Sequence, residues 1–133
     1  MILSIPLLIL VIAIYNFIAL FSGSAMEGVI WSPSLPSDAI LNLSIGDLLV
    51  ILGLILLFVE IFKSTRTGTS SIVDHLFSVG LFVVCLLELI LLPAFGTATF
   101  LFLTLMSLVD VVAGFTVTIA AARRDIGLDQ KVL

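Results

Sequence analysis

Four long apolar stretches fill this chain almost from end to end. They run over about residues 2–21, 45–62, 72–92 and 98–122. Each is about 18 to 25 residues long, and at about 1.5 Å per residue a helix of that length crosses a hydrocarbon core of about 30 Å. The pattern predicts an all-α integral membrane protein with four spanning helices.

The rest of the chain leaves no room for a soluble module. Of its 133 residues, 62% are hydrophobic and 11% are charged, with a mean hydropathy of +1.42. A small water-soluble domain needs a mostly polar surface, which this composition does not supply. We expect a single transmembrane domain over 1–133 that contacts the lipid bilayer and binds no nucleic acid.

All five basic residues are placed where the chain would emerge on one side of the membrane. They are Lys63, Arg66, Arg123, Arg124 and Lys131. The connections on the other side, including the outer loop at 22–44, carry no Lys or Arg, and cytoplasmic segments are the ones enriched in these residues. The sequence predicts an antiparallel, up-down-up-down four-helix bundle with both termini cytoplasmic and a cytoplasmic tail at 123–133.

The first stretch is expected to remain in the mature protein. Its apolar run exceeds the roughly 7 to 15 residues of a signal-peptide core, and no basic residue precedes it. A cleaved signal peptide is the rival interpretation, because Gly23, Ser24 and Ala25 are small residues of the kind that cleavage sites use.

The outer loop is too apolar to stand wholly in water. Met26, Val29, Ile30 and Trp31 come before the run Ser-Pro-Ser-Leu-Pro-Ser. We expect this loop to lie along the membrane interface, with Trp31 as an anchor at headgroup depth. A docking surface for a partner is the alternative.

The second and third stretches each open with Ser-x-x-Asp before an apolar run. Ser44 and Asp47 form the first of these patterns, and Ser71 and Asp74 form the second. In such a capping box the serine accepts hydrogen bonds from the first N–H groups, and the acid reaches back to the cap. We therefore expect helix caps at Ser44, Asp47 and Ser71.

A rim of ion pairs is expected at the inner end of the bundle. Glu60 lies one turn before the end of the second stretch, near Lys63 and close in height to Asp74 and His75. A gate or proton-entry role is an alternative. A metal site is a weak one, because these residues lack a dedicated ligand spacing. We expect neither a metal nor a cofactor.

Glu88 and Asp110 are the candidate functional residues inside the membrane, where charged side chains invite a functional hypothesis. Glu88 lies about 7 to 8 Å below the outer surface, level with Tyr15 and Asn16, and hydrogen bonds to these two would satisfy it. Asp110 lies about 18 Å from either end of its stretch, with no Lys, Arg or His expected at that height. We expect it to be neutral at pH 7 and to act as a hydrogen-bonding clasp or as a protonatable transport residue.

Small and weakly polar residues recur at helical spacing along the fourth stretch. They are Ser107, Asp110, Ala113, Gly114, Val117 and Ala121. Since small residues let helices approach closely, we predict that this stripe packs against another helix. After the stripe, Arg123 and Arg124 are expected to complement the helix C-terminus and to reach lipid phosphates.

Common catalytic motifs are absent from the sequence, which has no Gly-rich phosphate loop, HExxH, CxxC or Gly-x-Ser-x-Gly. Cys85 and His75 lie ten residues apart in one predicted helix, about 15 Å, so they cannot act as nucleophile and base within one chain. We expect no enzymatic activity.

Two parts of the chain carry a resemblance. The run VEIFKSTRTG at 59–68, followed by SIVDH at 71–75, resembles a group of small four-span bacterial inner-membrane proteins without an assigned activity. The run DVVAGF at 110–115, continued through ARRD at 122–125, is similar to theirs as well. The resemblance implies a bacterial inner (plasma) membrane location. Small multidrug exporters are another four-span comparison, but the membrane-embedded glutamate of their first helix has no counterpart here.

The leading hypothesis is a non-catalytic membrane protein that works by association, as a homo-oligomer or as an accessory subunit of a larger membrane complex. Four spans with short connections and no soluble domain motivate it. The alternative is a small oligomeric proton- or cation-coupled transporter or channel that uses Asp110 and Glu88.

Overall fold

The computed structural model describes residues 5–65 and 69–129 of the chain. Four α-helices dominate this part, with a short β-hairpin and two 3-10 turns between them. The elements are α1 (Leu8–Phe21), η2 (Gly23–Glu27), β1 (Val29–Trp31), β2 (Leu43–Ser44), α2 (Ile45–Ser64), α3 (Thr69–Leu91), η3 (Pro93–Phe95) and α4 (Ala98–Asp129). Among the described residues, α2, α3 and α4 are long and apolar enough to cross a membrane.

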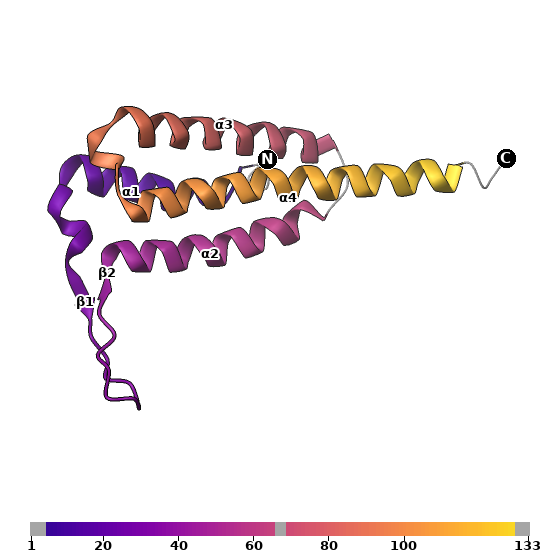
Figure 1. The fold of residues 1–133 in the computed structure, drawn as a ribbon. Helices are drawn as coiled ribbons and strands as arrows, with labels where there is room; N and C mark the ends of the chain where they lie inside the picture. The colour runs from indigo at the N-terminus through magenta and orange to yellow at the C-terminus, as the bar shows by residue number, and fades with distance from the viewer. Residues whose placement is uncertain (1–4, 66–68, 130–133) are drawn as a thin grey trace.

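The helices pack around α4. Helices α2 and α3 both pack against it, and α1 packs mainly against α2. Figure 1 shows the end of α2 and the start of α3 at one end of the bundle, and the end of α3, η3 and the start of α4 at the other. Residues far apart in the sequence therefore meet at each end.

Helix α1 is shorter than the span predicted over 2–21. It begins at Leu8 and has 14 residues, about 21 Å, so it is not among the helices long enough to cross the membrane. Pro6 lies just before its start. A proline lacks the backbone N–H and disfavours helical backbone in the residue before it, so the helix begins after it. Residues 1–4 lie outside the described part of the chain.

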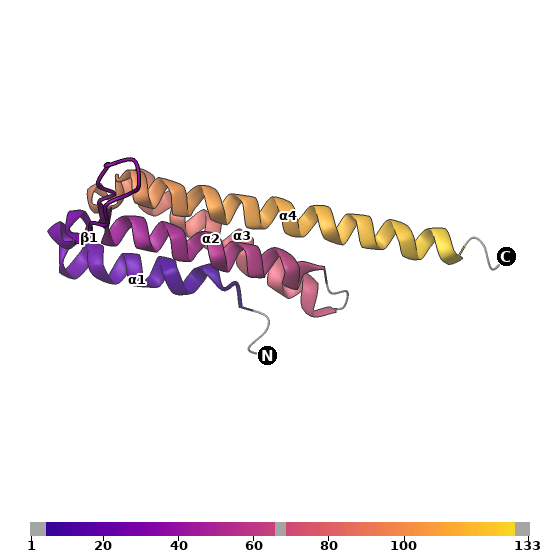
Figure 2. The same ribbon diagram turned by 90° about the horizontal axis from the view of Figure 1, so that it is seen from below.

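Helix α4 is longer than predicted, because it continues past 122 to Asp129. The run Ala120-Ala121-Ala122-Arg123-Arg124 consists of strong helix formers, and no proline follows it. Arg123 and Arg124 therefore lie inside the helix and not at its C-terminus. Figures 1 and 2 both show α4 running beyond the ends of α2 and α3.

Two glycines let α2 lie close to α4. A Cβ added at Gly46 would lie 2.6 Å from Thr99 Oγ1, and one at Gly53 would lie 2.9 Å from Met106 Sδ. Both distances are well inside ordinary contact between carbon-sized atoms, about 3.5 to 4.0 Å. The two glycines are seven residues apart, on one face of α2, so the helices touch along two turns.

The outward faces of the helices are apolar. Leu76 on α3 is 72% exposed, and Ile90, Phe58 and Phe102 are exposed as well. Such wide exposed apolar faces on helices of spanning length indicate contact with lipid.

Residues 29–44 form a hairpin that projects away from the helices (Figure 1). Strands β1 and β2 are antiparallel, and an isolated bridge joins Ser34 and Ile40 further out. At the tip Asp38 has a φ of 62°, a left-handed conformation that Asp tolerates in turns. Trp31 ends β1 and is 61% exposed. Its role as an interface anchor stays a prediction.

Candidate functional site

The predicted cap at the start of α2 is confirmed. The Asp47 backbone N–H donates to Ser44 Oγ, and the Ser44 backbone N–H donates to Asp47 Oδ2 at 2.9 Å. The cap predicted at Ser71 is wrong in position, because α3 already begins at Thr69 and Ser71 lies within its first turn. The side chain of Ser71 is outside the described residues.

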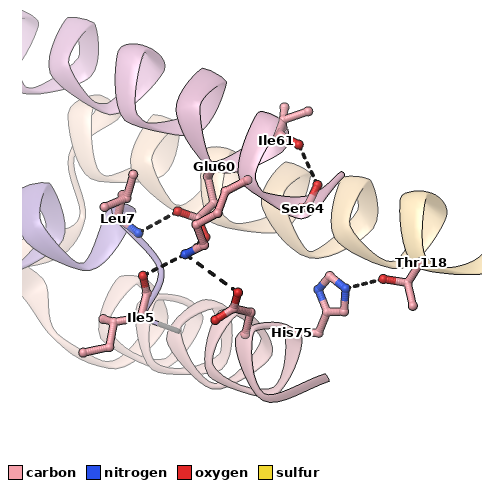
Figure 3. A network of polar contacts seen from close by, with 9 residues as sticks. Ile5, Leu7, Glu60, Ile61, Ser64, His75 and Thr118 are labelled. Atoms are coloured by element: carbon pink, nitrogen blue, oxygen red, sulfur yellow. Dashed lines mark hydrogen bonds and ion pairs between the residues drawn. The ribbon is translucent and has the colours of Figure 1, made fainter. Parts of the chain in front are cut away.

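Lys63 forms the centre of an ion-pair group at the end of the bundle where α2 ends and α3 begins. Its Nζ lies 2.8 Å from Glu60 Oε1 and 3.9 Å from Asp74 Oδ2, and it donates to the Ile5 carbonyl oxygen at 3.1 Å. Figure 3 shows these contacts converging from α2, α3 and the segment before α1. The predicted ion pairs of Glu60, Lys63 and Asp74 are therefore present.

Glu60 also caps a helix other than its own. The Leu7 backbone N–H donates to Glu60 Oε2 at 2.9 Å, and Leu7 is the N-cap residue of α1, which has no cap from its own side chains (Figure 3). A carboxylate at a helix N-terminus interacts favourably with the helix dipole. Sequence reasoning missed this role, since no spacing rule connects two residues 53 positions apart.

His75 contacts α4. Its Nε2 shares a hydrogen bond with Thr118 Oγ1, and its ring stacks on Phe115 with ring centroids 5.5 Å apart. The imidazole also lies directly against Gly114, where a Cβ would be 2.5 Å from Nδ1. His75 is 8% exposed, so the imidazole is part of the interface between α3 and α4.

Asp110 lies one turn from this histidine contact and is 5% exposed. The Ser78 side chain hydrogen-bonds to it, and the charges of Lys63 and His75 reach it. Its Oδ2 has no hydrogen-bond partner among the described residues. His75 contacts Gly114, four residues from Asp110, so a basic side chain lies about one helical turn from the height at which none was expected.

Heights counted along each predicted span separately do not give the register between neighbouring helices. Because α4 extends to Asp129, Asp110 is about 18 Å from the start of the helix but about 28 Å from its end. Packing of α3 against α4 sets Ser78 opposite Asp110, which brings His75 within one turn of it. The placement of Ser78 and His75 relative to Asp110 follows only from the register between the packed helices.

At the end of the bundle where α3 ends and α4 begins, the prediction for Glu88 is correct for one partner and wrong for the other. Asn16 Nδ2 donates to Glu88 Oε2 at 3.3 Å. The Tyr15 hydroxyl instead shares a hydrogen bond with Thr97 Oγ1, at 2.5 Å, and its ring packs between Phe95 and Phe100. Tyr15 thus holds α1 against η3 and the start of α4. The hydrogen bond to Glu88 comes from Asn16.

The small-residue stripe of α4 faces other helices in its middle part. Ser107 and Asp110 are buried, and Gly114 packs on His75 of α3. Ala113, Val117 and Ala121 are half-buried. The prediction that the stripe packs against another helix is confirmed at Gly114 and stays a prediction for Ala113, Val117 and Ala121.

The described acids are not arranged as a metal site. Within residues 5–65 and 69–129, no three His, Cys, Asp or Glu side chains are grouped so that they could hold a metal ion. Comparison with protein-family models, with curated proteins and with solved structures finds no match to this chain.

Proposed function

We propose that this protein works by association within a membrane, as a homo-oligomer or as an accessory subunit of a larger membrane complex, and not by catalysis. The observation that supports this proposal is the α4 extension, residues 122–127, whose side chains are exposed. Figure 2 shows the end of α4 standing clear of the other described helices.

The α4 extension has a pattern suited to a partner helix. Ile119, Ala122 and Ile126 are spaced three and four residues apart, so they lie on one face, and Ile126 is 63% exposed. Short helical segments without tertiary contacts are marginal in water. A second membrane-embedded chain that covers Ile126 would stabilise the extension, and Arg123 and Arg124 would contact lipid phosphates beside it.

We also propose four passes and cytoplasmic termini in a bacterial inner membrane, with the apolar stretch 2–21, of which α1 covers residues 8–21, as the first pass. The basic residues support this orientation, because Lys63 lies in the last turn of α2 and Arg123 and Arg124 lie in the last two turns of α4. Figure 1 shows these ends of α2 and α4 on the side of the bundle away from the hairpin. The hairpin and Trp31 then lie on the outer surface.

One cross-linking experiment tests association and orientation together. Cys85 is the chain's sole cysteine and is buried, so Cys85→Ser gives a background for Ile126→Cys. An impermeant thiol-to-amine cross-linker should join position 126 to a second chain in inverted membrane vesicles and leave it unmodified in intact spheroplasts.

The matched control is Ile30→Cys on β1, which is 58% exposed and should react only from the outer side. Reaction of position 126 from outside would overturn the orientation. Labelling from inside by a simple maleimide, with no cross-linked product of higher mass, would overturn the association.

A second candidate function is a small oligomeric transporter or channel for protons or cations. The buried Asp110 carboxyl favours it, because Oδ2 lacks a hydrogen-bond partner within the described chain while Lys63 and His75 lie close enough for their charges to act on it. Carboxyl groups that change charge inside a membrane are typical of such proteins.

A further inference from the structure

Among the described residues, acids outnumber bases in the polar group that joins α2, α3 and α4. Glu60, Asp74 and Asp110 come from three different helices and face one lysine and one histidine, Lys63 and His75. Even with a protonated His75, one of these three carboxylates has no counter-charge within residues 5–65 and 69–129. Burial strongly disfavours an unpaired charge, which favours a neutral acid or a bound cation in this group.

Glu60 and Asp74 already have partners for a negative charge. Glu60 lies 2.8 Å from Lys63 Nζ and accepts the Leu7 N–H. Asp74 Oδ1 lacks a hydrogen-bond partner, but its Oδ2 faces the same ammonium at 3.9 Å and its side chain is 19% exposed. Both carboxylates therefore face the Lys63 ammonium.

Asp110 differs from the other two acids. It is 5% exposed, its described side-chain partner is the neutral Ser78 hydroxyl, and its Oδ2 has no hydrogen-bond partner in the described structure. A protonated carboxyl removes the excess charge without requiring space for an ion and its ligands. The proton is thus a better ligand for this position than a metal cation.

The same geometry supplies a base to exchange that proton. His75 and Ser78 are three residues apart on α3, and Asp110 and Gly114 are four residues apart on α4, so the imidazole on Gly114 lies one turn from the Ser78–Asp110 contact. His75 lies on the side of Asp110 toward the inner end of the bundle, where Thr118 shares its hydrogen bond.

We propose that Asp110, Ser78 and His75 form a proton-binding site in which Asp110 holds the proton and His75 exchanges it with the inner side. In the exchange the Asp110 O–H bond breaks and an N–H bond forms on the imidazole, which leaves a carboxylate beside an imidazolium. Glu60, Lys63 and Asp74 form the charged boundary of the site on the inner side. This inference is independent of whether the protein associates or transports.

Infrared spectroscopy of the whole protein in lipid tests the site. A neutral carboxylic acid gives a C=O stretching band apart from the carboxylate bands, and this band shifts when the acid proton exchanges with D₂O. Protein at neutral pH should show it, and incorporation of aspartate ¹³C-labelled at its carboxyl group should move it. An unmoved band, or none, would overturn the proposal without any variant having to fold.

Two variants refine the assignment. Asp110→Asn should remove the aspartate band, whereas Glu27→Gln in the exposed η2 turn should leave it unchanged. His75→Gln should keep the band but slow its exchange with D₂O by about tenfold or more, since a positioned base accelerates proton transfer by about 10² to 10⁴. Equal exchange rates in folded wild type and His75→Gln would remove His75 from the site.

Discussion

Gly114→Leu is expected to separate α3 from α4 and to destabilise the protein by more than about 3 kcal/mol. Even the first side-chain carbon would lie 2.5 Å from His75 Nδ1, and the imidazole is held by Thr118 and Phe115. Overpacking by smaller groups already costs about 1 to 3 kcal/mol, so Gly114→Ala should fall within that range. The free energy of unfolding in mixed detergent micelles measures both variants.

Gly80→Ala is the matched control for this prediction. Gly80 lies on the exposed face of α3, where an added Cβ meets nothing within 4 Å, so alanine should be neutral or slightly stabilising. A double-mutant cycle isolates the contact, because Gly114→Ala should cost much less in a His75→Ala background. Equal costs in both backgrounds would show that His75 is not the obstacle.

Glu60→Ala is expected to cost about 3 kcal/mol of unfolding free energy. This value is at the low end for breaking a buried ion pair, because Lys63 keeps Asp74 and the Ile5 carbonyl oxygen as partners. The substitution also leaves the Leu7 N–H without its acceptor, so α1 should loosen at its start. Unfolding in mixed micelles gives the total, and hydrogen exchange at the first amides of α1 should rise.

Glu60→Gln and Glu88→Gln distinguish the two parts of this effect, which are the loss of the ion pair with Lys63 and the loss of the cap on α1. The glutamine oxygen at position 60 can still accept the Leu7 N–H, so that variant should lose the ion pair but protect α1 better than alanine does. Glu88 makes a longer hydrogen bond, 3.3 Å to Asn16, and its replacement should cost about 1 kcal/mol or less. If Glu60→Ala lowers the unfolding free energy no more than Glu88→Gln does, Glu60 does not stabilise the start of α1.

Local patterns predicted the elements whose signals lie within a few residues. The start of α2 at Ile45 followed from Ser44 and Asp47, because a capping box is satisfied within one turn. The start of α1 and the end of α4 were misjudged. Hydrophobicity marks where a helix can lie in lipid, but Pro6 at one end and the alanines before Arg123 at the other decide where the backbone stays helical.

In the candidate site, the sequence predicted a contact only where depth along the helices was sufficient to identify the partner residue. Counting turns from the outer surface brought Glu88 to the level of Asn16, and the structure shows that contact. The same counting left Asp110 without basic neighbours, although Lys63 and His75 act on it. The depth of a residue along its helix does not show which face of which neighbouring helix the residue meets. The partners of Asp110 could therefore not be found in this way.

The sequence by itself determined that this chain has helices of spanning length, where α2 is capped and which acids are buried, because these properties depend on hydrophobic runs and local hydrogen bonds. Tertiary structure decided what the acids do. Glu60 caps α1 from 53 residues away, and Gly114 admits His75 to the turn next to Asp110. Both contacts depend on the register of packed helices, which close approach at small residues sets and no local pattern encodes.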